Sequence, residues 1–240
     1  NDYDDELATT DDVIIINIVT AGGSELYSIK DAAIAGESVP NQTTTATNDV
    51  SWTVNHTVTG DEDDGYASYT YTAVDLAGNT TTVTSASSDI RIDNTAPTLG
   101  TIEIYSNNDD ITQAKIDDII SIKIVANEQL RALSPPVISI QGNNATITPG
   151  GDGITFTGTY QMDNLDIEGA VAFTIAFENT LGVAGDPISD DGSGSTTSNG
   201  SAVVFDRTAP ALSAVTIATN NDNTAYAKEG SIITLSFTAD

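Results

Sequence analysis

An internal repeat constrains the fold of this chain more than any other feature of its sequence. The stretch DNTAPTLGTIEIYSNNDD begins at Asp93 and returns at Asp206 as DRTAPALSAVTIATNNDN, 113 residues later and without a gap. Over the 35 residues that follow from each Asp, 14 positions are identical. A fixed offset of this size is typical of an array of similar domains. The repeat predicts an incomplete unit at 1–95, a complete unit at 96–208 and the first two strands of a third unit at 209–240.

Three segments at the repeat spacing alternate apolar with mostly polar residues, which is the pattern of a half-buried strand. The segments are 11–20, 117–126 and 230–239. Their expected inward rows are Ile14, Ile16 and Ile18, then Ile120, Ile122 and Ile124, then Ile233, Leu235 and Phe237. Similar runs at 51–58, 66–74 and 170–178 give about seven short strands per unit, which predicts β-sandwiches. Helix is expected as one turn at most, and 7–12 and 29–37 are its best candidates.

The order of these motifs resembles the bacterial Ig-like repeats of microbial cell-surface proteins. The resemblance rests on DxTAP, a strand, NND, AK and an alternating strand, and on DLAGN at 75–79 shortly before DNTAP. It spans the whole chain and implies an all-β fold of tandem Ig-like antiparallel β-sandwiches. It also implies an extracellular, cell-surface protein of the surface-layer, filament or adhesin-stalk type, with copies of itself or neighbouring Ig-like domains as partners. The second unit departs from the pattern, with ENTLGVAGD at 178–186 and a Gly/Ser-rich stretch at 188–201.

Composition excludes several classes of function. The 35 acidic and 7 basic residues give a net charge of −28, which repels the phosphate backbone of nucleic acid. No apolar run approaches the roughly 20 residues of a membrane-spanning helix, so no membrane insertion is expected in this segment. The absence of cysteine excludes disulfides and thiolate chemistry. The single histidine, His56, falls at the end of the Trp52–Val54 row and is assigned a structural role, so no catalytic residue and no enzyme activity are predicted.

Dense carboxylate clusters predict Ca²⁺ at the joints between units, because hard cations take several oxygen ligands. In an up-and-down sandwich alternate loops share one end, so three acidic segments should meet at each linker. The expected ligands are Asp4, Asp5, Asp61, Asp63, Asp64 and Asp93 at the first joint, and Asp109, Asp110, Asp163, Asp166, Glu168 and Asp206 at the second. The alternative is that the loops splay apart and hold sodium ions diffusely.

Five sequons predict N-glycosylation at Asn41, Asn55, Asn79, Asn144 and Asn199, with Asn55 on an outward strand face and the others in loops. They would be unmodified surface residues in an organism without N-glycosylation. An alternative function is a glycan- or host-surface-binding adhesin module, which would use exposed aromatic side chains such as Tyr3, Tyr27 and Tyr226. Trp52 is placed in the core of the first unit, and the alternative for it is an exposed, sugar-binding side chain.

The first unit is expected to lack its first strand, because Asn1 aligns with Asn107 and nothing corresponds to 96–106. Either the sequence is part of a longer chain, or a neighbouring subunit supplies the strand, as in a strand-exchanged fibre. In both cases a groove beside the Ile14–Ile16–Ile18 strand should be open. Residues 1–95 alone are therefore expected to be unfolded or oligomeric.

Overall fold

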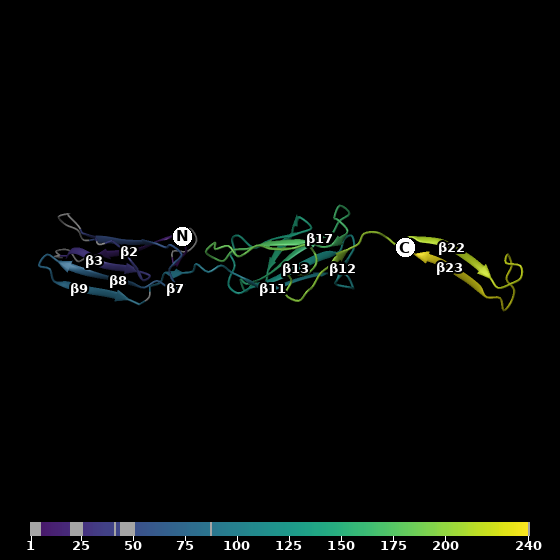
Figure 1. Ribbon diagram of the computed structural model, residues 1–240, viewed down its shortest axis with the longest axis horizontal. Helices are drawn as coiled ribbons and strands as arrows, with labels where there is room; N and C mark the ends of the chain where they lie inside the picture. The colour runs from purple at the N-terminus through teal and green to yellow at the C-terminus, as the bar shows by residue number, and fades with distance from the viewer. Residues whose placement is uncertain (1–5, 20–25, 41, 44–50, 87, 240) are drawn as a thin grey trace.

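The computed structural model describes residues 6–19, 26–40, 42–43, 51–86 and 88–239, and it contains strands and turns with no helix in these ranges. Three groups of strands follow one another along the long axis of the molecule (Figure 1). The all-β, Ig-like sandwich fold expected from the sequence is confirmed. The two helix candidates are wrong, because 7–12 contains strand β1 (Leu7–Ala8) and 29–37 lies largely in strand β3 (Leu26–Ile34).

The second unit is a two-layer sandwich. One sheet has the strand order β11-β13-β17-β16, the facing sheet has the order β15-β14-β19-β20, and a short sheet, β12-β21-β18, closes one end. The bounds are β11 (Leu99–Ser106), β12 (Gln113–Ala114), β13 (Ile119–Ala126), β14 (Val137–Ile140), β15 (Asn143–Asn144), β16 (Thr146–Pro149), β17 (Thr155–Gln161), β18 (Gly169–Ala170), β19 (Phe173–Ala176), β20 (Ile188–Asp190) and β21 (Val204–Phe205). Alternation places Ile120, Ile122 and Ile124 of β13 in the core opposite Phe173 and Ile175 of β19, as expected.

The first unit repeats this plan with fewer strands. Its sheets have the orders β2-β6, β4-β3-β8-β9 (with β5 also paired to β3) and β1-β10-β7. The remaining bounds are β2 (Val13–Val19), β4 (Glu37–Ser38), β5 (Gln42–Thr43), β6 (Ser51–Thr57), β7 (Gly65–Tyr66), β8 (Tyr69–Asp75), β9 (Thr80–Ser85) and β10 (Arg91–Ile92). Trp52 and Val54 of β6 are buried with Ile14 and Ile18 of β2, so the core position expected for Trp52 is confirmed.

Two strand pairs depart from the expected antiparallel arrangement. β1 pairs in parallel with β10, and β12 pairs in parallel with β21. In each unit a two-residue strand from the early part of the unit lies beside the last strand of the same unit and runs in the same direction. This pairing ties the beginning of each unit to the strand that leads into the next linker.

The third group of strands is a two-stranded antiparallel hairpin of β22 (Leu212–Thr219) and β23 (Ile233–Ala239). The expected burial of Ile233, Leu235 and Phe237 is wrong, because these side chains are 60, 62 and 60% exposed. Their counterparts on β13 are covered by a facing sheet, and no described segment covers this hairpin (Figure 1). The alternating pattern specifies a face but does not supply the layer that covers it.

Candidate functional site: the joints between the units

A carboxylate holds the first linker, DNTAP at 93–97. Asp64 ends the loop before β7, and its Oδ1 atom accepts a hydrogen bond from the backbone N–H of Asn94 at 2.6 Å. Its Oδ2 atom accepts a hydrogen bond from the hydroxyl of Thr95. The Thr95 hydroxyl, the Asn94 amide and the charge of Arg91 lower the pKa of Asp64, against a smaller opposing effect of burial. The carboxylate therefore stays ionised and fixes the two residues before the Ala-Pro pair.

The second linker, DRTAP at 206–210, carries the same arrangement. Glu168 precedes β18, and its Oε1 atom accepts hydrogen bonds from the backbone N–H of Arg207 at 3.0 Å and from the hydroxyl of Thr208 at 2.6 Å. The Thr208 hydroxyl and the Arg207 amide lower the pKa of Glu168. Arg207 and Thr208 are the repeat equivalents of Asn94 and Thr95. We call this carboxylate with its two linker donors, Asp64 with 94–95 and Glu168 with 207–208, the linker clamp.

Each clamp carboxylate is followed by a glycine with a positive φ angle. Gly65 has φ of 137° and Gly169 has φ of 115°, values that residues with a side chain rarely adopt. The glycine lets the chain turn directly from the acidic residue into the short strand that pairs with β10 or β21. An acidic residue followed by Gly, ahead of a DxTAP motif, is thus a sequence signal for the clamp.

The second unit also binds the first linker, through hydrogen bonds from Asn127 and Asn179. The backbone N–H of Thr98 donates to Oδ1 of Asn127 at 2.7 Å, and the N–H of Asn127 donates back to the carbonyl of Thr98 at 3.0 Å. The side-chain amide of Asn179 donates to the carbonyl of Thr95 at 3.4 Å. Pro97 is buried, and a Cβ on Gly185 would lie 2.8 Å from its carbonyl oxygen. The linker therefore has partners in both units that it joins.

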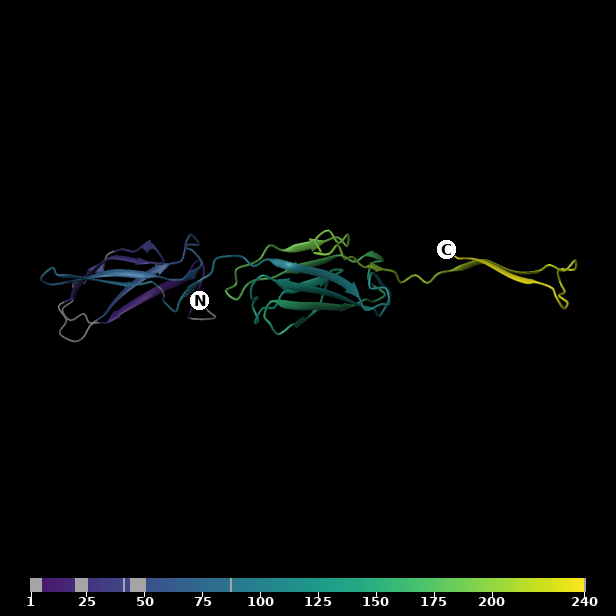
Figure 2. The same ribbon diagram turned by 90° about the horizontal axis from the view of Figure 1, so that it is seen from below.

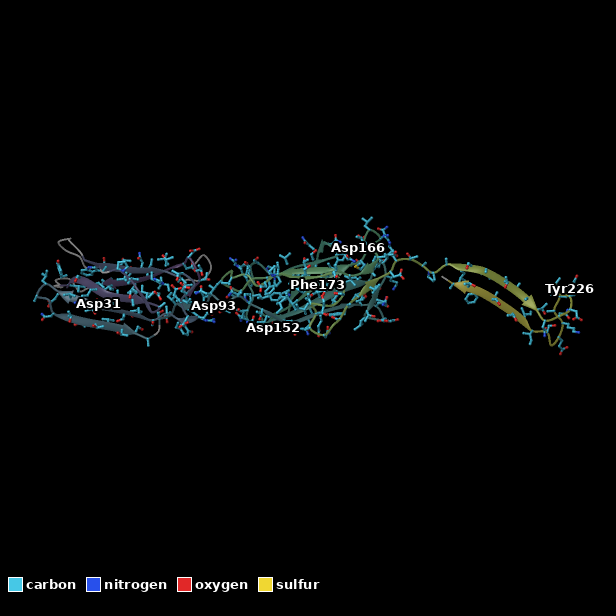
Figure 3. The ribbon with its side chains drawn as sticks, viewed as in Figure 1. Asp31, Asp93, Asp152, Asp166, Phe173 and Tyr226 are labelled. Carbon is cyan, nitrogen blue, oxygen red and sulfur yellow. The ribbon has the colours of Figure 1, made fainter. Side chains whose placement is uncertain are left out.

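Asp93 lies at this joint (Figure 3), and charges of the first unit act there on Glu128 of the second. Asp93 is buried, and one of its carboxylate oxygens lies 3.6 Å from Nη2 of Arg91. Glu128 follows β13, and its pKa is raised mainly by burial, with the negative charges of Asp93 and Asp64 adding to the effect. Sequence reasoning missed Glu128 because it lies outside the dense acidic clusters.

The structure places several expected cation ligands in other hydrogen bonds. Asp166 is buried and accepts from the backbone N–H of Asp163, from the amide of Asn143 and from the hydroxyl of Tyr160, at 2.7, 3.2 and 3.2 Å. Asp110 accepts from the N–H and hydroxyl of Thr112. These carboxylates organise their own loops through protein donors.

The remaining expected ligands are exposed or lie outside the described residues. Asp61, Asp63, Asp109, Asp163 and Asp206 are exposed; the side chain of Asp163 accepts from the backbone N–H of Leu165 at 2.6 Å, and that of Asp206 accepts from the backbone N–H of Thr208 at 2.8 Å. Asp4 and Asp5 lie outside the described residues. Within the described part of the chain, no group of three or more His, Asp or Glu side chains is placed to hold a metal ion. Calcium at the joints stays a prediction.

Glu62 is a further residue that sequence reasoning missed. Its buried side chain accepts hydrogen bonds from the backbone N–H groups of Thr59 and Gly60 at 3.0 and 2.9 Å, and its Oε1 atom lies 2.6 Å from Nε2 of His56. Burial alone would raise the pKa of Glu62, but the hydrogen bonds from His56, Thr59 and Gly60 together lower it to about 2. His56 and Glu62 thus fix the loop that leads to Asp64.

The sequon asparagines in the described residues are all exposed: Asn55 in β6, Asn79, Asn144 and Asn199. Asn144 lies in β15 and not in a loop as expected. The amide of Asn79 donates to Asp75 at 2.8 Å, which closes the DLAGN turn, and the amide of Asn199 donates to Glu103 at 3.4 Å. Asn41 lies outside the described residues. Glycosylation of these sites stays a prediction.

Comparison with known proteins gave weak similarities only. No family model matches the chain, and no curated protein matches it. Among solved structures, BcpA, the major pilin subunit of Bacillus cereus, is 13% identical with a TM-score of 0.21, and a single-substitution variant of BcpA is 12% identical with a TM-score of 0.20. Both alignments cover 95% of this chain and 84% of the pilin.

Proposed function

We propose that this chain is part of an extracellular structural protein, a tandem array of Ig-like units that builds a filament, surface layer or stalk by holding its units at a fixed spacing. The observation that carries this proposal is the linker clamp, which recurs at Asp64 and Glu168 on repeat-equivalent linker atoms. The cell-surface location rests on the resemblance of the repeat to microbial surface domains.

The clamp restricts the linker because it acts on the residues that proline leaves free. Pro97 and Pro210 fix their own φ angles and bias the preceding alanines towards an extended backbone. Asp64 binds the backbone N–H of Asn94 and the hydroxyl of Thr95, just before Ala96, while the Asn94 side chain also accepts from the backbone N–H of Thr10 at 3.0 Å. Ordering the backbone of a residue costs roughly 1–2 kcal/mol, and the hydrogen bonds to Asp64 offset part of that cost. The geometry therefore favours a joint of defined angle over a flexible tether.

Small-angle scattering of the 240-residue chain tests the proposal. We expect the parent chain to be an elongated particle with a well-defined maximum dimension. The Asp64→Ala/Glu168→Ala double variant should have a shorter mean dimension and a broader distribution of interatomic distances. Asp63→Ala is the matched control, because Asp63 is exposed in the same loop as Asp64. Identical scattering from the double variant and the parent would contradict a stiffening role for the clamp.

Calcium would add to this stiffness at the first joint. The motivation is the negative charge beside the first linker, where burial and then the charges of Asp93 and Asp64 raise the pKa of Glu128. These three side chains are not placed as a ready-made metal site, so a cation would have to draw its ligands together. After chelation, titration with Ca²⁺ should show saturable binding and a higher melting temperature, and Asp93→Ala should weaken both. A melting temperature that does not respond to millimolar Ca²⁺ would rule calcium out as a structural ion here.

A glycan-binding adhesin module remains a second proposal. Of the tyrosines expected to serve it, Tyr226 is exposed in the β22–β23 loop, and Tyr27 is exposed on β3 and not in a loop. Tyr3 lies outside the described residues. Binding of the chain to a glycan array, and its loss in Tyr226→Ala, would favour this function.

A further inference from the structure

Strand β9 forms one edge of the larger sheet of the first unit. The sheet has the order β4-β3-β8-β9, and β9 pairs with β8 on one side with no described segment on its other side. In the second unit β20 takes the place of β9 as the last strand of its sheet, and β11 lies in the opposite layer beside β13. β9 is six residues long and runs along the long axis of the molecule (Figure 1). It therefore offers an uncovered edge within a unit.

The hydrogen-bond pattern of the β8–β9 pair shows which backbone groups of β9 face outwards. The N–H of Asp75 donates to the carbonyl of Asn79 at 3.0 Å, and these two residues continue the register of the strands as a hydrogen-bonded pair. Hydrogen-bonded and non-hydrogen-bonded pairs alternate along an antiparallel ladder. Thr80, Thr82 and Thr84 fall in the non-hydrogen-bonded pairs, so their N–H and C=O groups point away from β8.

β9 lacks the features that protect other strand edges of the two sandwiches. Folded proteins keep edges from pairing by charge, proline, short strands or a covering segment. β16 ends at Pro149, β20 has three residues and ends at Asp190, and the Gly/Ser-rich stretch covers β11. β9 contains only Thr, Val and Ser, and residues 76–88 carry no charge in a chain with a net charge of −28. The β9 edge is thus suited to pair with another strand.

The outward groups of β9 are symmetric about Thr82, which favours a second copy of the same strand as the partner. Antiparallel pairing centred on Thr82 sets it opposite Thr82 of the other copy and sets Thr80 opposite Thr84, so that all outward N–H and C=O groups find partners. The side chains match as well. Within the unit the Thr82 hydroxyl lies 3.1 Å from that of Thr72, and the Thr84 hydroxyl lies 3.1 Å from that of Thr70. The same Thr–Thr pairing would continue from one copy to the next.

We propose that two copies of this chain pair antiparallel through β9, with Thr82 on the two-fold axis, and so join their larger sheets into one continuous sheet. The axis keeps the threonine faces of both sheets on one side and the half-buried Val83 side chains towards the two cores. An uncharged contact suits two molecules of strong like charge. Because β9 runs along the row of units, the paired chains lie side by side in opposite directions. The inference rests on the proposed structural function for its purpose, and its geometry does not require the linker clamp.

A single engineered cysteine tests the register, because the chain has none of its own. We expect Thr82→Cys to form a disulfide-linked dimer under mild oxidation, since the two Cα atoms would be about 5.5 Å apart across the axis. Thr84→Cys is the matched control: it is exposed on the same face, but its two copies would be four residues, or roughly 13 Å, apart along the strands. Asp64→Ala should not change the yield from Thr82→Cys, which separates a failure of this inference from a failure of the proposed function. Equal dimer yields from Thr82→Cys and Thr84→Cys would overturn the register.

Charged substitutions test whether two copies meet at Thr82. Thr82→Lys and Thr82→Glu should each weaken dimerisation in sedimentation about tenfold or more, because like charges would face one another across the axis. A mixture of these two variants should restore association, and the neutral Thr82→Gln should keep most of it. Melting of the first unit should change little, since the Thr82 side chain is exposed. A parent chain that sediments as a monomer at the highest attainable concentration, or a mixture that associates no better than either charged variant alone, would overturn the inference.

Discussion

Several carboxylates among the described residues act as hydrogen-bond acceptors for nearby backbone groups. Glu62 accepts from two backbone amides, and Asp190 accepts from the backbone N–H groups of Gly192, Gly194 and Thr196 at 2.8, 3.1 and 2.8 Å. Burial tends to raise the pKa of Asp190, but these hydrogen bonds outweigh it and the pKa is lowered. Much of the strongly acidic composition is thus used to fix turns, a role that composition alone does not reveal.

The Glu62 contacts predict a pH dependence for the first unit. Its pKa is about 2 in the folded protein, against an ordinary value of 4.5. A lowered folded-state pKa means that the stabilisation is fully present above the unfolded value and is lost as the pH falls from about 4.5 towards about 2. Thermal unfolding followed across this pH range should show that the melting temperature falls more steeply in the parent than in Glu62→Gln. Asp61→Asn is the control. Parallel curves for parent and Glu62→Gln would contradict the account.

Trp52 tests the core of the first unit. Trp52→Ala should lower the free energy of unfolding by about 3–5 kcal/mol, because a large buried side chain is removed. Trp52→Phe should cost less, since the indole N–H has no hydrogen-bond partner among the described residues and no polar contact is lost. Denaturant unfolding followed by circular dichroism measures both. A parent whose tryptophan emission is red-shifted and readily quenched by iodide would instead support an exposed, sugar-binding Trp52.

At the scale of elements, the Gly/Ser-rich stretch of the second unit protects a sheet edge. Asp190 closes the turn at its start, and the chain then runs beside β11. There the N–H of Ser198 donates to the carbonyl of Ile102 at 2.8 Å, and the hydroxyl of Ser201 accepts from the N–H of Ile104 at 3.0 Å. An exposed strand edge recruits other strands, so this cover protects the β11 edge from pairing with another chain.

Removing the Asp190 carboxylate should uncover that edge. In Asp190→Ala we expect faster hydrogen exchange at the backbone amides of Ile102 and Ile104, because Ser198 and Ser201 lose their fixed positions. Asp191→Ala is the control, since Asp191 is exposed and accepts from Ser193 within its own turn. Unchanged protection of both amides in Asp190→Ala would show that the stretch is held by other contacts.

The sequence patterns predicted the strands and their buried faces better than they predicted the contacts between side chains. Alternation identified the buried row of β13 and the core position of Trp52. It failed for Ile233, Leu235 and Phe237, because periodicity does not show whether another layer is present. Asp64 and Glu168 were singled out for their charge, but charge alone does not show that the fold brings them to the backbone of the linker. Glu128 was missed for the same reason: only the fold brings it towards Asp93.

At the scale of the whole molecule, the units lie in a row (Figure 2). The linkers between them determine how neighbouring units are oriented. The first linker is held by Asp64 on one side and by Asn127 and Asn179 on the other. Gly185 adds to this grip, because a methyl group at that position would collide with Phe177 and with the Pro97 carbonyl. A string of such joints transmits orientation from unit to unit, as a filament, lattice or stalk requires.

Gly185→Ala should therefore disturb the joint as well as the second unit. A Cβ at this position would lie 2.2 Å from the Phe177 ring, so either the ring or the linker must move. We expect a lower melting temperature for the second unit and a wider range of interdomain angles in small-angle scattering. Gly182→Ala, where the nearest atom is the flexible end of Arg131 at 3.3 Å, controls for strain elsewhere in the same loop, although its positive φ also costs stability. Scattering unchanged from the parent in Gly185→Ala would mean that the Pro97 contact does not set the angle.

The distribution of distances between the first two units is the most direct test of the linker clamp. Spin labels on Thr57→Cys and Thr174→Cys, two exposed strand positions in a chain without native cysteine, report it by pulsed electron paramagnetic resonance. We predict one narrow distance distribution for the labelled parent and for Asp63→Ala, and a clearly broader one for Asp64→Ala. A distribution that is already broad in the parent, or that stays narrow in Asp64→Ala, would contradict a clamped joint.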